Sequence, residues 1–377
     1  MSVGSRQASV ASSWLRKRSK QQQQQQQQES GEIEVKVGKR RSMSTNGHAT
    51  MKIGGQEVHA FNDGDFSRVR GLHGLEGTEF LSSISFDEME AGGGKGGMMM
   101  AFTEDKQYIV KELNGADHGS LLRIAREYAD HVLSSEGSLI ARVFAHFEHA
   151  GHNYMVMNNW MPPPRIDAID TTKLRSLNLS TNYSQYDLKG CADDKTLKKM
   201  GGKIPAVHKR IFNVPLWCGH AFWTPERTKY YEGKLHARQV RFLVSPSVHK
   251  EITSKIDRDV KFLQRWSLMD YSLVVSYHVL PRSPGSNLIL DKVYRATSDH
   301  GEQPYIAHKD NQTFICYVGI IDFLQDWTTA KIIANVIKVA ERNKATIPPN
   351  PYGDRFAKFV AHKFDPTCED GDEPPVN

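Results

Sequence analysis

The chain has 377 residues, of which 39% are hydrophobic and 24% are charged, and its formal net charge at pH 7 is +6. This length suggests about two domains, and no stretch approaches the ~20 apolar residues that cross a bilayer, so we expect no integral membrane protein. The first ten residues lack the apolar core of a secretory signal. The four cysteines form no C-x-x-C pair, so we expect a protein of a reducing, intracellular compartment without a zinc ribbon or disulfide scaffold.

Positive charge is concentrated in two regions. Residues 1–50 contain nine Lys and Arg against three Glu, a net charge of +6. Residues 187–265 contain seventeen basic against eight acidic residues, a net charge of +9, whereas residues 266–377 carry −3. Both basic regions suit an anionic surface, either nucleic acid or the cytoplasmic leaflet of a membrane, and the alternative is a solvated face.

The two ends of the chain differ in texture from its middle. Residues 1–55 include an unbroken run from Gln21 to Gln28 and few large apolar side chains, a composition that predicts a disordered basic tail. Helix-like and strand-like periods persist from about residue 66 to 364. The acidic, Pro-rich residues 365–377 are predicted to form a second disordered tail.

A glycine-rich loop at residues 91–97 precedes two predicted strands, at 98–103 and 107–111, and the second strand carries Lys111. Glycine allows backbone N–H groups to approach a polyphosphate, and a lysine on the next strand can reach its phosphates. Most glycine-rich segments are only turns, and this one is not a P-loop because no G-K-[ST] string precedes a helix.

Further elements follow in a regular order. The spacing of apolar residues predicts a helix over 119–134, strands over 140–147 and 153–157, and a lobe boundary at the prolines of 162–164. In the second half, the pattern predicts a helix around 260–266, a turn and strand over 269–278, a polar connection over 296–312, an apolar strand over 314–323 and an amphipathic helix over 328–342.

Asp270 and Asp322 each stand in apolar surroundings, about fifty residues apart. A buried carboxylate is costly unless it is paired or binds a metal. Together with Lys111 they form the set of a two-lobed phosphotransferase, in which lysine holds phosphates, one aspartate holds Mg²⁺ and another orients the attacking hydroxyl. The alternative is a pair of capping or ion-paired residues. The strings H-R-D-L, D-F-G and A-P-E of protein kinases are absent.

Four strings occur in the order Asp187-Leu-Lys-Gly190, Leu268-Met-Asp-Tyr-Ser-Leu273, Ile320-Ile-Asp322 and Tyr352-Gly-Asp-Arg-Phe356. With them, the chain resembles the phosphatidylinositol phosphate kinase family and, within it, the catalytic domain of phosphatidylinositol 4-phosphate 5-kinases. The resemblance covers about residues 66–364. It implies an α+β, two-lobed lipid-kinase fold with antiparallel sheets and helices around an ATP cleft, with an N-lobe over 66–162 and a C-lobe over 163–364.

The resemblance also implies roles for individual residues. ATP would be bound by Lys111, by a covering loop and by a hinge; the loop and hinge residues are Gly93, Gly94, Lys95, Gly96, Gly97, Asn158, Asn159 and Trp160. The acidic partner of Lys111 would be Asp117 or Glu127, with Asp117 favoured.

Asp270 resembles the family's catalytic-loop aspartate, and Asp322 its Mg²⁺-binding aspartate. Lys189 would face the γ-phosphate and the lipid, and Lys195 and Arg355 would also contact the substrate. Lys195 stands where the family usually has Arg, and because lysine does not bind phosphate bidentately, we expect headgroup recognition to differ. Residues 338–352 occupy the place of the family's activation loop, which selects the lipid.

The resemblance implies an enzyme that uses ATP and Mg²⁺ to phosphorylate a phosphatidylinositol monophosphate to a bisphosphate. We favour phosphatidylinositol 4-phosphate and its 5-hydroxyl. The resemblance further implies a cytoplasmic protein that binds its lipid at the cytoplasmic face of a membrane, and we favour the plasma membrane. Because members of the family often form homodimers, a homodimer is also possible. Alternatives are a kinase for another monophosphate, a phosphoinositide-binding pseudokinase or scaffold, and a kinase for water-soluble inositol phosphates. Nucleic acid is not an expected partner, because no matching binding string is present.

Overall fold

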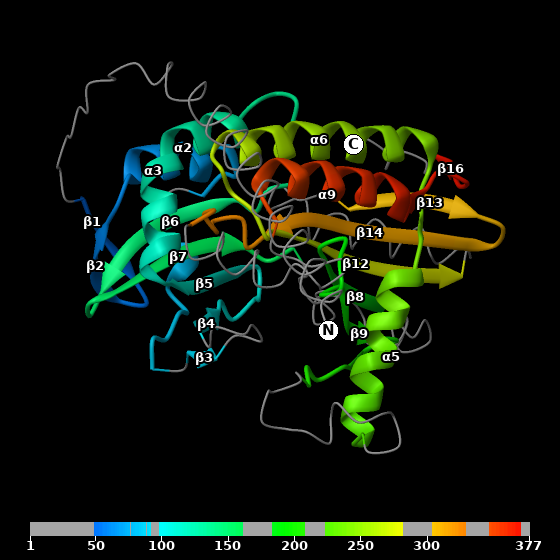
Figure 1. Cartoon of the computed structure of the whole chain (residues 1–377). Coiled ribbons are helices and arrows are strands. Elements are labelled where there is room, and N and C mark those ends of the chain that lie inside the picture. The colour runs from blue at the N-terminus through cyan, green and yellow to red at the C-terminus, as the bar shows by residue number, and fades with distance from the viewer. Residues whose placement is uncertain are drawn as a thin grey trace, which may run out of the picture. The chain divides into compact units, whose positions relative to one another are not determined.

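The computed structural model describes residues 49–75, 77–87, 89–91, 98–160, 183–207, 223–281, 304–328 and 347–370. All of these residues belong to one compact unit. Two antiparallel seven-stranded sheets form its framework, and helices cover them. Figure 1 shows the two sheets following one another along the molecule. The α+β class with antiparallel sheets that the sequence predicts is therefore confirmed.

The first sheet has the strand order β1-β2-β6-β7-β5-β4-β3. Its strands are β1 (Ala49–Ile53), β2 (Gln56–Ala60), β3 (Glu90–Ala91), β4 (Met99–Phe102), β5 (Tyr108–Leu113), β6 (Val143–His149) and β7 (His152–Asn158). Two helices, α2 (Asp63–Leu72) and α3 (Gly115–Val132), pack beside it (Figure 1). Asn114 caps α3 by accepting hydrogen bonds from the backbone N–H groups of Ala116 and Asp117, which fixes where β5 ends and the helix begins.

The second sheet has the order β10-β9-β8-β12-β14-β13-β16. Its strands are β8 (Tyr183–Leu188), β9 (Lys195–Lys199), β10 (Gly202–Lys203), β12 (Ser272–Pro281), β13 (Tyr305–Lys309), β14 (Gln312–Ile321) and β16 (Glu369–Asp370). Its helices are α5 (Pro225–Gln239), α6 (Pro246–Arg265) and α9 (Pro349–Lys363), and α6 and α9 lie side by side along the sheet (Figure 1). A short parallel pair, β11 (Phe242–Leu243) and β15 (Phe364–Asp365), follows α5 and α9.

Several boundaries predicted from the sequence are wrong. Strand β1 lies inside the predicted tail of residues 1–55, because it pairs along its whole length with β2 and buries Ile53 completely. Strands β15 and β16 extend into the predicted tail of 365–377, and β13 lies in the predicted polar connection of 296–312. These strands are short or polar, so their pairing depends on a neighbour that local periodicity does not reveal.

Other predicted elements agree with the structure. The strands expected around Lys111 are β4 and β5, and the helix expected over 119–134 is α3. The strand expected over 314–323, which was to carry Asp322, is β14, but it ends at Ile321, one residue before the aspartate. The glycines of 92–97, the prolines of 162–164 and all but the first residue of the predicted helix 328–342 lie outside the described residues.

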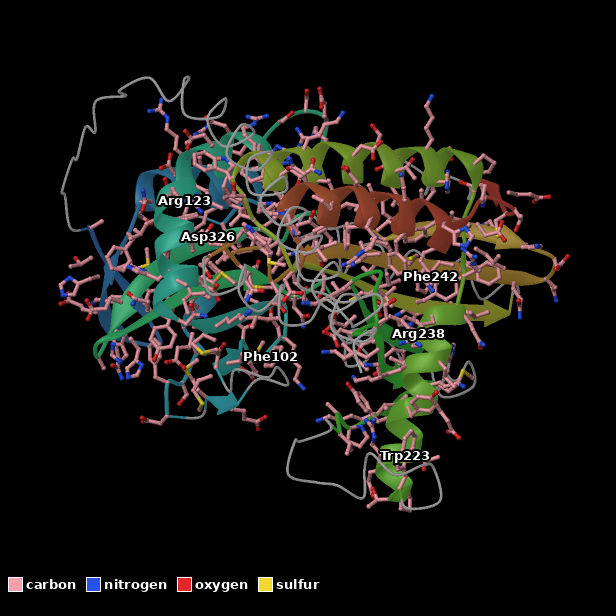
Figure 2. The ribbon with its side chains drawn as sticks, in the orientation of Figure 1. Phe102, Arg123, Trp223, Arg238, Phe242 and Asp326 are labelled. Carbon is pink, nitrogen blue, oxygen red and sulfur yellow. The ribbon has the colours of Figure 1, made fainter. Side chains whose placement is uncertain are left out.

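Lys363, the last residue of α9, caps the C-terminal end of α5, where Figure 2 labels Arg238. Its ammonium group donates hydrogen bonds to the carbonyl oxygens of Ala237, Arg238 and Val240 at 2.7, 2.8 and 3.0 Å. The side chain is 2% exposed. Burial lowers the pKa of Lys363 to about 8, although the charge of Asp194 opposes this change.

Lys363 is therefore expected to make stability depend on pH. Between pH 8 and the ordinary lysine pKa of 10.5, the unfolded chain keeps a proton that the folded protein has released, so the free energy of unfolding rises with pH. The free energy of unfolding of the wild type minus that of Lys363→Met should increase by roughly 2 kcal/mol from pH 7 to pH 10. Urea denaturation of both proteins at several pH values measures it, and a flat or falling difference contradicts the prediction.

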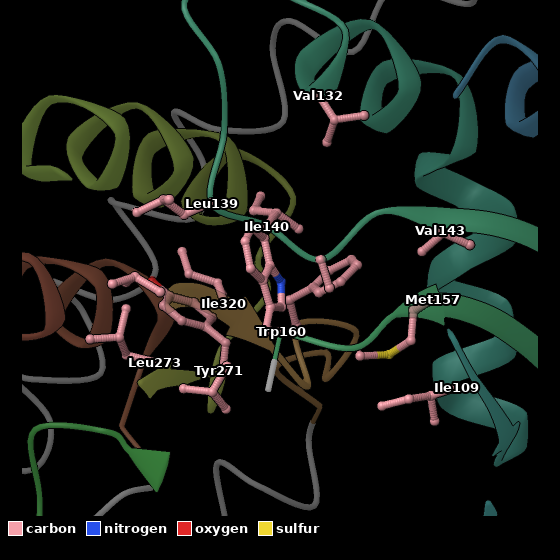
Figure 3. Close-up of a cluster of buried hydrophobic side chains, with 14 of the residues drawn as sticks. Ile109, Val132, Leu139, Ile140, Val143, Met157, Trp160, Tyr271, Leu273 and Ile320 are labelled. Carbon is pink, nitrogen blue, oxygen red and sulfur yellow. The ribbon is translucent and has the colours of Figure 1, made fainter. Parts of the chain in front are cut away.

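The two sheets are joined by backbone hydrogen bonds. Ala141 N–H donates to the Ile320 carbonyl at 2.9 Å, and Ile320 N–H donates to the Leu139 carbonyl at 2.6 Å. Around this bridge, buried side chains from both halves form one continuous core (Figure 3). The indole of Trp160 lies against Gly319 of β14, where a Cβ atom would stand 2.2 Å from the ring. The two sheets, which carry the predicted site residues, are thus packed together around one core.

Candidate active site

Lys111 and Asp322 come together from the two sheets. Lys111 lies on β5, Asp322 directly follows β14, and the lysine Nζ and the aspartate Oδ1 form an ion pair. The exposed fractions of the two side chains are 19% and 45%, so solvent and ligands can reach the pair. Asp322 is therefore the ionic partner that the structure gives for Lys111.

Lys189 and Asp270 form a second pair close to the first. The Nζ atom of Lys189 lies 2.7 Å from Oδ1 of Asp270 and donates a second hydrogen bond to the Asp270 carbonyl oxygen at 2.6 Å. The strand register explains why they meet. Leu188 pairs with Leu273, and Ser272 pairs with Ile321, so the residues at these strand ends gather at one end of the sheet.

Both aspartates have an unusual backbone conformation. The φ angle is +64° at Asp270 and +57° at Asp322, in the left-handed region that residues other than glycine rarely adopt. Backbone of this kind persists only where the surroundings hold it, and it is frequent at functional sites. The chain therefore turns sharply at Asp270, two residues before β12 begins, and at Asp322, one residue after β14 ends.

The charges at the site stabilise one another. Partial loss of hydration opposes ionisation of Asp322, but the positive charges of Lys111, Lys189 and Lys195 outweigh it and lower the pKa of the carboxyl. Burial likewise opposes the charge on Lys189, but Asp270, Asp187 and Asp322 outweigh it and raise the pKa of the ammonium. Asp322 and Lys189 are therefore both charged at neutral pH. Alternating cations and carboxylates can receive an anionic phosphate chain together with its metal ion.

Lys195 extends this pattern beside Lys189. It faces Asp187 across the β8–β9 pair, with its Nζ atom 2.8 Å from Oδ2 of the carboxylate. Arg355 lies on α9, with its guanidinium carbon 5.2 Å from the ring centroid of Tyr352. The Tyr352 hydroxyl donates a hydrogen bond to the Tyr271 carbonyl, so α9 is attached to the segment that carries Asp270.

The three predicted hinge residues have structural contacts. The side-chain oxygen of Asn158 accepts a hydrogen bond from Arg142 N–H at 2.8 Å, and Asn159 N–H donates to the Gln107 carbonyl at 2.8 Å. Trp160 is 6% exposed and belongs to the core. An adenine contact at this hinge stays a prediction, and the predicted covering loop, Gly93 to Gly97, lies outside the described residues.

Sequence reasoning did not identify two features of the site. It favoured Asp117 as the acidic partner of Lys111, whereas Asp117 lies in the first turn of α3 and accepts a hydrogen bond from the Asn114 side chain at 2.9 Å. It also passed over Asp194, which is 2% exposed and accepts hydrogen bonds from Lys189 N–H at 2.6 Å and Cys191 N–H at 3.3 Å. The available sequence signal for Asp194 was its position four residues after the Lys189-Gly190 turn.

The donor set fits Mg²⁺. In the part of the chain that the structure describes, no group of three or more His, Cys, Asp or Glu side chains is placed to hold a metal ion. Magnesium usually needs only one or two protein carboxylates, because phosphate and water oxygens complete its shell. The carboxylate of Asp322 provides this minimum at the end of the sheet where the lysines gather.

A comparison with family models identifies the chain. The model described as phosphatidylinositol-4-phosphate 5-kinase matches residues 82–363. The chain belongs to the phosphatidylinositol-4-phosphate 5-kinase family. This match covers the strands from β3 to β14, which belong to both sheets, and includes all four strings that carry the resemblance.

Individual relatives of this family are distant. The phosphatidylinositol 4-phosphate 5-kinase its3 of Schizosaccharomyces pombe is 22% identical over 80% of this chain and 45% of its own length. A probable phosphatidylinositol phosphate kinase of Dictyostelium discoideum is 24% identical over 84% of this chain and 48% of its own. The phosphatidylinositol 5-phosphate 4-kinase type-2 gamma of Danio rerio is 21% identical over 79% of this chain and 75% of its own. The chain thus spans about half the length of the first two relatives.

Proposed function

We propose that this chain transfers the γ-phosphoryl group of ATP to the headgroup of a phosphatidylinositol monophosphate, which yields a bisphosphate. The observation that carries this proposal is the convergence of two lysine–aspartate pairs, Lys111 with Asp322 and Lys189 with Asp270. Family membership supports it. Phosphoryl transfer needs positioning and charge neutralisation more than covalent participation of the protein, and these four side chains supply both.

Each side chain has a part in the proposed reaction. Lys111 and Lys189 offset the negative charge on the phosphate oxygens. Asp270 orients the attacking inositol hydroxyl and accepts its proton late in the transfer. Asp322 would hold Mg²⁺, which supplies additional positive charge to the β- and γ-phosphates when it is bound.

For the lipid, we propose phosphatidylinositol 4-phosphate and phosphorylation at the 5-hydroxyl, with Lys195 and Arg355 contacting the headgroup phosphate. The name of the matching family model supports this choice. Relatives named for the 5-phosphate substrate also match the chain, so the regiochemistry is an aim of the experiment below.

We place the reaction at the cytoplasmic face of a membrane, with the plasma membrane favoured. No helix within the described ranges is long and apolar enough to cross a bilayer. At the end of β9 away from Lys195, the β9–β10 turn presents exposed Lys199 and Lys203, with Met200 between them 60% exposed. Each basic residue at an anionic leaflet contributes about 1 kcal/mol to binding. A homodimer remains our prediction for the assembly, and light scattering on the purified chain tests it.

The proposed activity is tested with Mg-ATP and liposomes that each contain one phosphatidylinositol monophosphate. We expect turnover on the 4-phosphate, identification of the product as the 4,5-bisphosphate, and loss of at least 99% of the rate in Asp270→Asn, because a general base contributes about 100-fold or more. Turnover on another monophosphate overturns only the substrate. Liposome binding without turnover on any lipid overturns the enzyme and leaves a phosphoinositide-binding pseudokinase.

A further inference from the structure

Helix α3 contacts both segments that carry the catalytic aspartates. Its Arg123 side chain forms an ion pair with Asp326, and the same guanidinium donates a hydrogen bond to the Trp266 carbonyl at 3.4 Å. The second carboxylate oxygen of Asp326 accepts a hydrogen bond from the Ser120 hydroxyl at 3.0 Å. Figure 2 labels Arg123 and Asp326 close together where the helix meets the chain beyond β14. We call Ser120, Arg123, Trp266 and Asp326 the α3 clasp.

The contact points of the clasp are placed symmetrically about the site. Trp266 precedes Asp270 by four residues, and Asp326 follows Asp322 by four residues. The two segments are also bonded to each other. Met269 N–H donates to the Gln325 carbonyl at 2.9 Å, and Trp327 N–H donates to the Ser267 carbonyl at 3.2 Å. Arg123 therefore binds, from one side, a short antiparallel ladder whose two chains lead to the two aspartates.

The N-terminal end of α3 follows the strand that carries Lys111. Strand β5, which carries Lys111, ends at Leu113, and Asn114 caps the first turn of the helix. Lys111, Asp270 and Asp322 are thus all attached to α3, one through the chain and two through the clasp. A rigid helix connected to three functional segments can hold their side chains in one relative position.

The clasp is not explained by a large contribution to the stability of the fold. The side chains of Arg123 and Asp326 are 42% and 31% exposed, and ion pairs as accessible as this contribute little to folding free energy. The aspartates, in contrast, need support, because both have left-handed backbone conformations that only their surroundings maintain.

We infer that the α3 clasp is a positioning device for phosphoryl transfer, with Arg123 and Asp326 as positioning residues that hold Asp270 and Asp322 in register with Lys111. The inference rests on the proposed function and deepens it. Misplacement of a reacting group by about 1 Å can lower a rate about 100-fold. Loss of the clasp therefore lowers kcat and leaves the KM for lipid unchanged, because neither residue belongs to the proposed headgroup contacts.

The variants for a kinetic test are Arg123→Gln, Asp326→Asn and the double charge exchange Arg123→Asp with Asp326→Arg. The matched control is the ion pair between Arg68 of α2 and Asp130 of α3, which joins at 2.8 Å and is 48% and 56% exposed, tested as Arg68→Gln and Asp130→Asn. We expect each single clasp variant to lower kcat about 10- to 100-fold with unchanged lipid KM, the charge exchange to restore part of the rate, and the control variants to match wild type.

Hydrogen exchange on the whole chain without lipid gives a second readout that does not need activity. The amides of Met269 and Trp327 should exchange faster in Asp326→Asn than in Asp130→Asn. Faster exchange together with lower kcat supports the inference. Unchanged kcat in the clasp variants overturns it, and so does unchanged exchange at both amides.

Failure of the proposed function has a different signature. Wild-type protein that turns over no lipid overturns the kinase proposal, and the exchange measurement then decides the clasp by itself. Equal exchange in Asp326→Asn and Asp130→Asn shows that the clasp holds nothing in place, whereas faster exchange shows that it positions the two segments independently of the reaction.

Discussion

Replacing Asp322 with asparagine is expected to lower the turnover number by about 1000-fold or more. The carboxylate is the proposed Mg²⁺ ligand, and charge stabilisation by a catalytic metal contributes several kcal/mol, which corresponds to about three orders of magnitude. The same change removes the ionic partner of Lys111, so the lysine loses the contact that the structure gives it. The measurement is steady-state kinetics with Mg-ATP on the preferred lipid.

Asp310 provides a matched control for this substitution. It is exposed, lies in the turn between β13 and β14, and has a φ of +53°, close to the +57° of Asp322. Asparagine tolerates the left-handed conformation as well as aspartate does. Asp310→Asn should keep wild-type activity, and both variants should keep wild-type secondary structure by circular dichroism. An Asp322→Asn protein with more than a tenth of the wild-type rate would falsify the metal-binding role.

Replacing Gly319 with alanine is expected to destabilise the protein by about 3 kcal/mol or more. A Cβ atom there would stand 2.2–2.3 Å from three atoms of the Trp160 indole, far inside van der Waals contact. Trp160 is buried beside the bridge between the sheets (Figure 3), so the ring has no free space to occupy. Added atoms in a close-packed core typically cost about 1–3 kcal/mol, and a contact this short belongs at the upper end. Thermal unfolding measures the effect.

The control is Gly202→Ala on β10, another strand glycine, which is exposed and whose Cβ would meet only the Lys199 carbonyl at 3.4 Å. Its effect should stay within about 0.5 kcal/mol. Combining Gly319→Ala with Trp160→Phe should destabilise by less than the sum of the two single changes, because the smaller ring makes room for the methyl group. A Gly319→Ala protein with an unchanged melting temperature shows that the indole can move, and this prediction is then wrong.

Local patterns explain which parts of the fold and site the sequence predicted. Lys111 was placed on a strand because the two strand-like runs after the glycine-rich loop are local signals, and β5 has that position. Asp322 was expected at an apolar strand, and it directly follows β14. Asp322 was also marked by the string Ile320-Ile-Asp322, so the resemblance and the apolar pattern pointed to the same position.

The unpredicted parts depend on contacts between distant residues. The pairing of Lys111 with Asp322 joins positions 211 residues apart, and no spacing rule reaches that far. Strand β1 and strand β13, which lies between β14 and β16, were missed because their burial comes from neighbouring strands. Trp160 looked like a hinge residue in the sequence, and only Gly319 on the other sheet shows that its ring has a place in the core.

The backbone bridge between Ile140 and Ile320 limits how this protein can open. A kinase whose halves are connected by a single strap can swing them apart to admit nucleotide and release product. Here main-chain hydrogen bonds at Ile320, two residues before Asp322, and a shared core join the two sheets. Separating the sheets would expose apolar surface to water. If the chain uses ATP as proposed, nucleotide must therefore enter and leave without separation of the two sheets at this bridge.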